Sequence, residues 1–348
     1  MFIVACLIAI ISCACIATII PGFFLVLRRM ALMSDAISHA VLPGIVIMFL
    51  LVKRLDSPLL LYGASLAGLL IVAVTQYVIN SGKIRKEVAI GLIFPFFFSL
   101  GVILICRYAR DVHLDTDMVL LGDIVFTPFR LLSFNGIVLG PYALWLMAGL
   151  IVCNALFVTI FYKELLTATF DQDYAQLMGL RPTVIHCVLM GLTSITAVAA
   201  FDLVGSIVVV ALMVVPAATS LLCTDRIQVA LILALCFGVL SGVGGYAFAH
   251  MYDISISGSV ALMAGFLFLL LFIIAPKRGM RAMWIFKSRS AKKMAIRALR
   301  LFLDKTDLNG YQFPTESLVY RASKELGWTV SYTSTVMQWA WQKGGNHR

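Results

Sequence analysis

Nine long apolar stretches constrain the fold of this chain more than any other feature of its sequence. A helix needs about 20 apolar residues to cross the hydrocarbon layer of a bilayer. Apolar residues make up 61% of the chain and charged residues 13%, against about 25% charged residues in soluble proteins. One soluble fold cannot bury so much apolar surface, so we predict an all-α membrane protein, a polytopic bundle of about nine transmembrane helices. The stretches are roughly 2–27, 36–52, 58–80, 88–106, 137–161, 184–201, 204–223, 227–249 and 256–275.

The number of spans depends on whether the region from 184 to 223 forms two spans or one. Asp202 and Gly205 interrupt its apolar run. A backbone break at membrane depth occurs only where protein or water covers the freed polar groups. If this region is one broken or re-entrant segment, the chain has eight spans.

The net charge of +10 lies in the C-terminal part of the chain. Residues 1–276 hold 13 Lys/Arg and 13 Asp/Glu, whereas residues 277–348 hold 14 and 4. We therefore predict a transmembrane domain, 1–286, followed by a basic helical cytoplasmic tail, 287–348. Lys and Arg are enriched in cytoplasmic loops. With the N-terminus outside, the short inner loops hold eight of these residues and the outer loops five, so we predict N-outside and C-inside.

The best candidates for metal ligands are Asp35 and His39. They are four residues apart and therefore stack on one face of a helix. A carboxylate and an imidazole suit Mn, Fe or Zn better than Cu(I), and two copies of the chain meeting at a two-fold axis could offer four ligands. We also expect Pro43-Gly44 to weaken the helix one turn later. The alternative is that Asp35 caps the helix and His39 bonds a neighbouring carbonyl.

A polar segment at 170–182 separates two apolar stretches and predicts a short amphipathic helix. Gly179 is a typical C-terminal breaker. Such a helix could project from the membrane and dock into another protein, or it could lie at the membrane interface. Asp202, which interrupts an apolar run, is a weaker candidate for a residue of the transport pathway.

Motifs for ATP binding are absent from the sequence. It contains no GxxxxGK[ST] loop, the glycine-rich loop that cradles nucleotide phosphates. No Ser/His/Asp or Cys/His constellation stands out either. We therefore expect the chain not to be an enzyme and to have no ATPase site of its own.

Three segments resemble the ABC-3 family, the membrane permease subunits of ABC importers for zinc, manganese and iron. The resemblance implies a type II-like importer in the bacterial cytoplasmic membrane. It pairs this chain with an identical or paralogous permease, cytoplasmic ATPase subunits and an extracytoplasmic metal-binding protein. It assigns the metal path to Asp35 and His39. It also assigns ATPase coupling to Asp171, Asp173, Ala175, Gly179 and Arg181. The matching segments are 27–44, 170–179 and 204–219.

The expected cargo is a divalent Mn, Zn or Fe ion, with no permanently bound cofactor. Three other functions stay open at this point. One is a secondary transporter driven by an ion gradient. The second is a permease for metal chelates such as haem or siderophores. The third is a membrane-tethered regulator that acts through its tail.

The tail predicts three helices, at 290–303, 314–326 and 331–343. Gly327 between the last two is typical of a helix-turn-helix or winged-helix module. The third helix carries Lys343 as its only basic residue and also Trp339 and Trp341. This favours docking against the ATPase or the membrane lipid over nucleic acid, which would require basic phosphate contacts.

Overall fold

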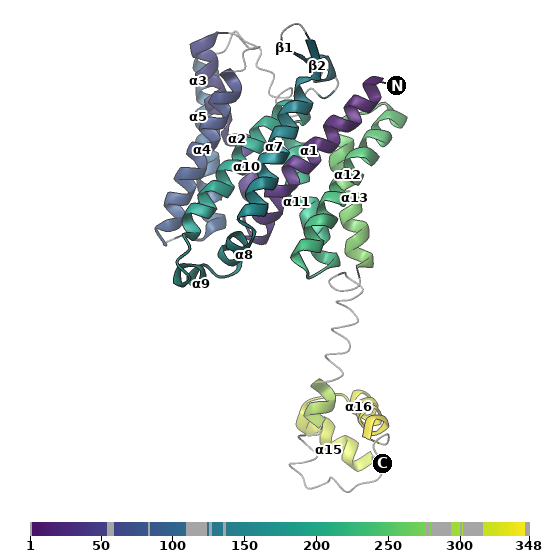
Figure 1. Ribbon diagram of the computed structural model, residues 1–348. Helices are drawn as coiled ribbons and strands as arrows, with labels where there is room; N and C mark the ends of the chain where they lie inside the picture. The colour runs from purple at the N-terminus through teal and green to yellow at the C-terminus, as the bar shows by residue number, and fades with distance from the viewer. Residues whose placement is uncertain are drawn as a thin grey trace. The chain divides into compact units, whose positions relative to one another are not determined.

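Helices form nearly all of the described chain in the computed structural model (Figure 1). The structure describes residues 2–53, 59–82, 84–108, 124, 127–134, 137–275, 279, 294–299, 301 and 316–344. Nine helical segments among them are long and apolar enough to cross a membrane, with α2 and α3 together forming one segment. They are α1 (Phe2–Leu27), α2 (Leu32–Ala40) with α3 (Leu42–Val52), α4 (Leu59–Asn80), α5 (Lys86–Tyr108), α7 (Tyr142–Ile160), α10 (Pro182–Val204), α11 (Ser206–Cys223), α12 (Ile227–Tyr252) and α13 (Ile256–Ile274).

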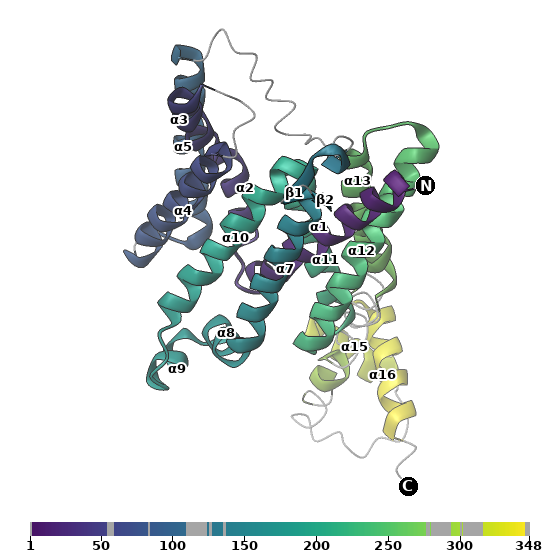
Figure 2. The same ribbon diagram turned by 45° about the horizontal axis from the view of Figure 1, so that its top comes forward.

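The helices α1, α10 and α11 form the inside of the bundle. α1 packs against α7, α10, α11 and α12. α3, α4 and α5 lie on one side of this group, and α12 and α13 lie on the other (Figures 1 and 2). In α1, α10 and α11, at least half of the most apolar 18-residue stretch is buried. In α5, α7 and α13, 22% of the corresponding stretch is buried. The outer helices therefore present apolar side chains to their surroundings, as expected for lipid contact.

Short secondary-structure elements lie at both ends of the bundle. β1 (Leu131–Phe134) pairs antiparallel with β2 (Ile137–Pro141), next to the 3-10 turn η1 (Thr127–Phe129). This hairpin lies at the end that holds the N-terminus, whereas α8 (Tyr162–Phe170) and α9 (Gln172–Leu177) lie at the opposite end (Figures 1 and 2). The segment between α7 and α10 is therefore on the far side of the bundle from the hairpin.

Among the described residues, the structure has nine candidate spans, as predicted, and not eight. α10 and α11 are two separate helices, each long enough to span. The expected break at Asp202 is wrong, because α10 runs through Asp202 to Val204. The break is at Gly205, whose φ of 88° lies in the region that glycine adopts without steric cost.

The predicted span 137–161 begins five residues too early. Residues 137–141 belong to β2, and α7 starts at Tyr142. The backbone N–H of Tyr142 donates to the carbonyl of Arg130 at 2.8 Å, which closes the hairpin. Pro141 is extended, with ψ of 129°, and precedes the first turn of α7. Hydropathy could not separate the strand from the helix because both are apolar here.

The chain divides into two compact units, 1–272 and 273–348. The second unit contains α15 (Glu316–Leu326) and α16 (Val330–Gly344) around a small apolar core. Gly327, with φ of 65°, makes the turn between them, as the sequence predicts. Of the predicted helix 290–303, residues 294–299 and 301 are described and helical. The predicted boundary at 286 lies outside the described residues.

We predict that Gly22→Ala destabilises the transmembrane unit. A Cβ at Gly22 would lie 2.7 Å from the Cα of Met213, so α1 and α11 would have to separate. Overpacking of this kind costs about 1–3 kcal/mol. Thermal unfolding of the purified chain in detergent measures the effect. The matched control is Gly149→Ala in α7, where an added Cβ meets nothing within 4 Å; it should be neutral or slightly stabilising. Equal melting temperatures for both variants would contradict the close approach.

Candidate metal-ion site and coupling segment

The helix α2 carries the predicted metal ligands and follows a tight turn. Arg29 has a φ of 58°, and the helix starts after Ala31 without a side-chain cap. Asp35 is thus inside the first turns of α2 and is not its N-cap, so the capping alternative is wrong. α2 ends at Ala40, and α3 begins at Leu42 after Val41, whose backbone angles stay helical.

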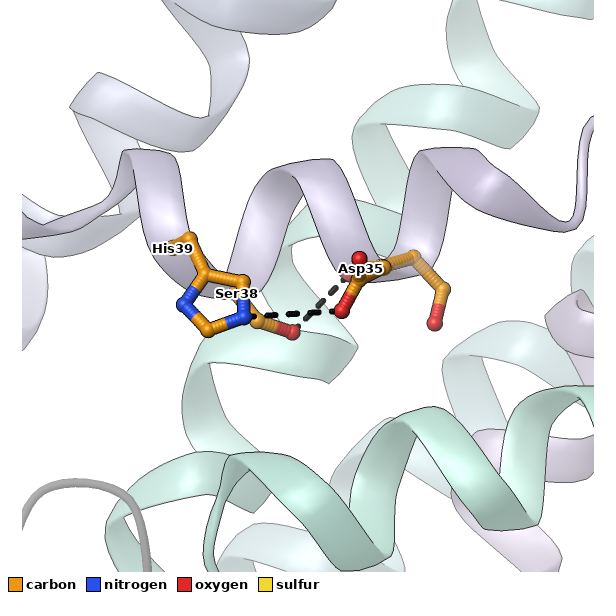
Figure 3. A network of polar contacts seen from close by, with 4 residues as sticks. Asp35, Ser38 and His39 are labelled. Carbon is orange, nitrogen blue, oxygen red and sulfur yellow. Dashed lines mark hydrogen bonds and ion pairs between the residues drawn. The ribbon is translucent and has the colours of Figure 1, made fainter. Parts of the chain in front are cut away.

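Asp35 and His39 face the same side of α2 (Figure 3). The imidazole Nε2 of His39 lies 3.5 Å from Oδ1 of Asp35. The side chain of Asp35 is 47% exposed and that of His39 is 33% exposed. Ser38 turns its hydroxyl back along the helix and donates to the carbonyl of Ser34 at 2.9 Å. Asp35 and His39 therefore form an open two-ligand group that is accessible from outside the single chain.

Aromatic rings from α5 fix the position of the imidazole. The rings of Phe94 and Phe98 lie with centroids 5.4 and 5.9 Å from that of His39, the second in an edge-on geometry. The rings restrict the orientations of the imidazole. They also form an apolar wall beside the imidazole.

Within the described residues, no third His, Cys, Asp or Glu joins the pair to form a metal cluster. Pro43 has no N–H to donate to the carbonyl of His39, the acceptor four residues earlier. The other ligands of a bound ion would have to come from water or from a second chain.

Asp202 lies away from the metal pair. Its carboxylate is 3.4 Å from Nη1 of Arg130, which follows the 3-10 turn η1. Both side chains are at least half exposed, so this ion pair contributes little to stability. It joins the C-terminal end of α10 to the hairpin side of the bundle.

The predicted short helix at 170–182 is α9, and both of its ends are capped. The carboxylate of Asp171 accepts from the backbone N–H of Tyr174 at 2.9 Å, which is an N-cap bond. At the other end, the N–H of Leu180 donates to the carbonyl of Ala175 and the N–H of Gly179 to that of Gln176, both at 3.0 Å. With Gly179 at a φ of 77°, this is a Schellman motif.

These caps hold a short helix with an exposed apolar tip. Tyr174, Leu177 and Met178 are 49%, 87% and 62% exposed. Ala175 points the other way and is fully buried, and Asp173 lies in the first turn of the helix, where the helix dipole favours a negative charge. The caps therefore hold these apolar side chains at the surface of the described chain.

A buried arginine connects α8 and α10 to the turn before α2. Arg28, in the turn between α1 and α2, is 8% exposed. Its Nε donates to Oγ1 of Thr169 in α8 at 3.0 Å, and its Nη1 lies 2.7 Å from Nδ1 of His186 in α10. Burial lowers the pKa of Arg28 to about 10, so the guanidinium stays protonated at neutral pH. His186 must therefore accept at Nδ1 and is neutral.

We predict that Arg28→Met destabilises the chain by about 1–3 kcal/mol, because the buried Nδ1 of His186 loses its donor. Thermal unfolding in detergent measures this change. Arg29→Asn is the matched control. Arg29 is exposed and asparagine tolerates its left-handed backbone conformation, so this variant should stay within about 0.5 kcal/mol of wild type. A larger loss in the control than in Arg28→Met would show that the buried network does not stabilise the turn.

Comparison with known proteins identifies the family. The sequence pattern of the ABC 3 transport family matches residues 1–275. The chain belongs to this family. Manganese transport system membrane protein MntD of Bacillus subtilis (strain 168) is 41% identical over 269 residues, which cover 77% of this chain and 89% of MntD. Zinc transport system membrane protein TroD of Treponema pallidum (strain Nichols) is 37% identical over 337 residues, which cover 94% and 89%.

A solved ABC-3 relative has the same fold. PsaBC from Streptococcus pneumoniae, in complex with Fab, superposes with a TM-score of 0.65 at 30% identity. The match covers 80% of this chain and 94% of that chain. The predicted family and the all-α transmembrane fold are therefore confirmed. The match to TroD extends over most of the chain, whereas the family pattern ends at residue 275.

Sequence reasoning placed Asp35 and His39 on one helical face and found the segment around α9, but it missed Arg28. A basic residue directly after the first span is typical of a cytoplasmic loop, and nothing in the sequence marked Arg28 as buried. The sequence does indicate the exposed tip of α9, because Tyr174, Leu177 and Met178 are apolar residues in an otherwise polar segment.

Proposed function

We propose that this chain is the permease subunit of an ATP-driven importer of divalent transition-metal ions. The carrying observation is the Asp35–His39 pair, 3.5 Å apart and partly exposed on a transmembrane segment. A carboxylate open to lipid is costly, so such groups face a pathway or a partner. Manganese and zinc are the preferred cargoes, because the chain is similar to a manganese and a zinc transport protein; iron(II) prefers the same ligand types.

A second permease subunit, identical or paralogous, would complete the site. If it covers the exposed side of α2 around a two-fold axis, two carboxylates and two imidazoles converge on the passage. The ligands of one chain alone are too few to replace the hydration shell of the ion. A site shared between two subunits can also come apart when the subunits move, which releases the ion. Binding has to be weak enough for this release.

The segment α8–α9 would receive the ATPase. Its apolar tip offers a docking surface, and the four helices α10–α13 follow it. Arg28 ties α8 and α10 to the turn before α2. A movement of α9 can therefore be transmitted to Asp35 and His39. It would pass through the two hydrogen bonds of Arg28 and then along the seven residues of chain from Arg28 to Asp35. ATP hydrolysis is assigned to a separate subunit, since the sequence lacks a phosphate-binding loop.

The orientation follows from this assignment. The end with α8 and α9 is cytoplasmic, and the end with the N-terminus and the hairpin faces an external metal-binding protein. We propose the bacterial cytoplasmic membrane as the location. The tail, 287–348, then lies in the cytoplasm, where it could contact the ATPase or the membrane lipid.

Uptake into sealed vesicles tests the function. The chain is reconstituted with its candidate ATPase and metal-binding protein, and the entry of radioactive manganese, zinc or iron(II) is followed. We expect uptake that requires ATP and stops when the ATPase is omitted. Uptake that continues without the ATPase, and that an ionophore abolishes, would indicate a secondary transporter instead. Uptake of a metal chelate but not of the free ion would contradict the cargo.

A further inference from the structure

A basic cleft lies at the α9 end of the bundle, away from the metal pair. It has a volume of about 470 Å³ and lies between the turn after α1, the end of α4 and the start of α5. Two isoleucines form its apolar part, and four cationic residues and one acid form the rest. The lining residues are Arg28, Arg29, Ile79, Ile84, Arg85, Lys86 and Glu87.

The positive charge of the cleft has no counter-ion in the described part of the chain. None of its four cations takes part in the ion pairs formed there. Arg28 is 8% exposed, and its Nη2 is buried without a hydrogen-bond partner. A buried donor on a charged group without an acceptor is costly. The four cations outnumber the single carboxylate, that of Glu87, so the cleft is strongly positive and is suited to an anion.

An exposed apolar stripe runs along α5 from the edge of this cleft. It begins at Val88, one residue after Glu87, and continues one turn at a time through Leu92 and Phe96. These side chains are 57%, 63% and 66% exposed. Phe94, which contacts His39, lies about 200° around the helix from Phe96 at ~100° per residue. The stripe therefore faces away from the side on which a second permease would cover the metal pair.

We propose that the cleft binds the phosphate headgroup of an anionic phospholipid, with an acyl chain along Val88, Leu92 and Phe96. A phosphodiester accepts from several guanidinium and ammonium donors at once. Basic pockets between transmembrane helices at the membrane surface are suited to anionic headgroups. The apolar stripe explains why the ligand is a lipid rather than a soluble anion. The inference depends on the membrane location of the chain and not on the metal that it transports.

The test is lipid binding by the full-length chain purified in detergent. Phosphatidylglycerol, phosphatidylcholine and inorganic phosphate are added separately, and thermal unfolding is recorded against concentration. We expect phosphatidylglycerol to raise the melting temperature and the other two to have little effect. Each basic residue near an anionic membrane surface is worth about fivefold in affinity. The double variant Arg85→Gln/Lys86→Gln should therefore bind phosphatidylglycerol about 25-fold more weakly.

Lys163→Gln is the matched control, since Lys163 is an exposed cation at the same end of the bundle that does not line the cleft. It should bind phosphatidylglycerol as wild type does. An equal loss in this control, or equal stabilisation by both lipids, would overturn the proposal. Suppose that inorganic phosphate instead raises the melting temperature as much as phosphatidylglycerol does, in a way that depends on Lys86. That result would show that the ligand of the cleft is not a lipid. Loss of ATPase binding in the double variant, with unchanged lipid binding, would assign the cleft to the ATPase.

Discussion

We expect Asp35→Asn and His39→Gln each to abolish metal uptake in reconstituted vesicles while the permease still assembles with its ATPase. Both substitutions keep the size of the side chain and remove one metal ligand of the pair. Loss of a group that only supports a metal ligand typically costs 10–100-fold in affinity, so loss of the ligand itself should lower uptake by about 100-fold or more. Initial uptake rates of manganese and zinc measure the effect, and co-purification of the ATPase shows that assembly is intact.

Ser38→Ala is the matched control for these two variants. Ser38 is on the same helix between the two ligands, and its hydroxyl bonds only the carbonyl of Ser34. Its removal should leave uptake close to that of wild type. If both ligand variants transported metal normally, the assignment of Asp35 and His39 would be wrong. The chain would still belong to its transport family, but the metal path would have to lie elsewhere.

We expect Leu177→Asp to weaken the binding of the ATPase to the permease and thereby to reduce uptake. Leu177 is 87% exposed at the tip of α9, so the change should not disturb the permease itself. A buried anchor residue at an interface typically contributes about 2 kcal/mol or more, which is roughly a 30-fold loss of binding. We therefore expect ATPase binding to fall by at least about 30-fold and uptake to fall with it. Binding is measured with the detergent-purified permease and its ATPase.

The control for the coupling variant is Gln176→Asp. It introduces the same charge one residue earlier on α9, at an exposed polar position. It should reduce ATPase binding far less than Leu177→Asp does. Equal losses would show that negative charge on α9 is harmful in itself, and that the apolar tip is not the docking surface. Unchanged melting temperatures in both variants would confirm that the helix is intact.

The fold could be predicted largely from the sequence because hydropathy and helical period carry most of the information in a membrane bundle. The helix ends were placed within a few residues for most spans. The hairpin at 131–141 was missed since its apolar strands are continuous in hydropathy with α7. Of the two residues predicted to interrupt the region 184–223, Gly205 ends α10 and Asp202 does not, because the backbone conformation decides the helix end.

The site was only partly predictable. The spacing of Asp35 and His39 predicts a shared face on any helix, whatever the tertiary structure. The ring contacts that position His39 come from a distant segment, Phe94 and Phe98 in α5. Their proximity depends on the packing of the bundle, which a single sequence does not encode in any local pattern. Gly179 was predicted as the end of the short helix, whereas the role of Asp171 as its N-cap became clear only from the hydrogen bond to Tyr174.

The direct test of the central claim is electron spin-echo spectroscopy of Mn²⁺ bound to the assembled transporter. An imidazole that coordinates Mn²⁺ couples its nitrogen to the electron spin of the metal. We predict this nitrogen coupling in the wild-type protein and its loss in His39→Gln, with Ser38→Ala unchanged. Bound Mn²⁺ without nitrogen coupling in the wild type, or a coupling that persists in His39→Gln, would contradict the account.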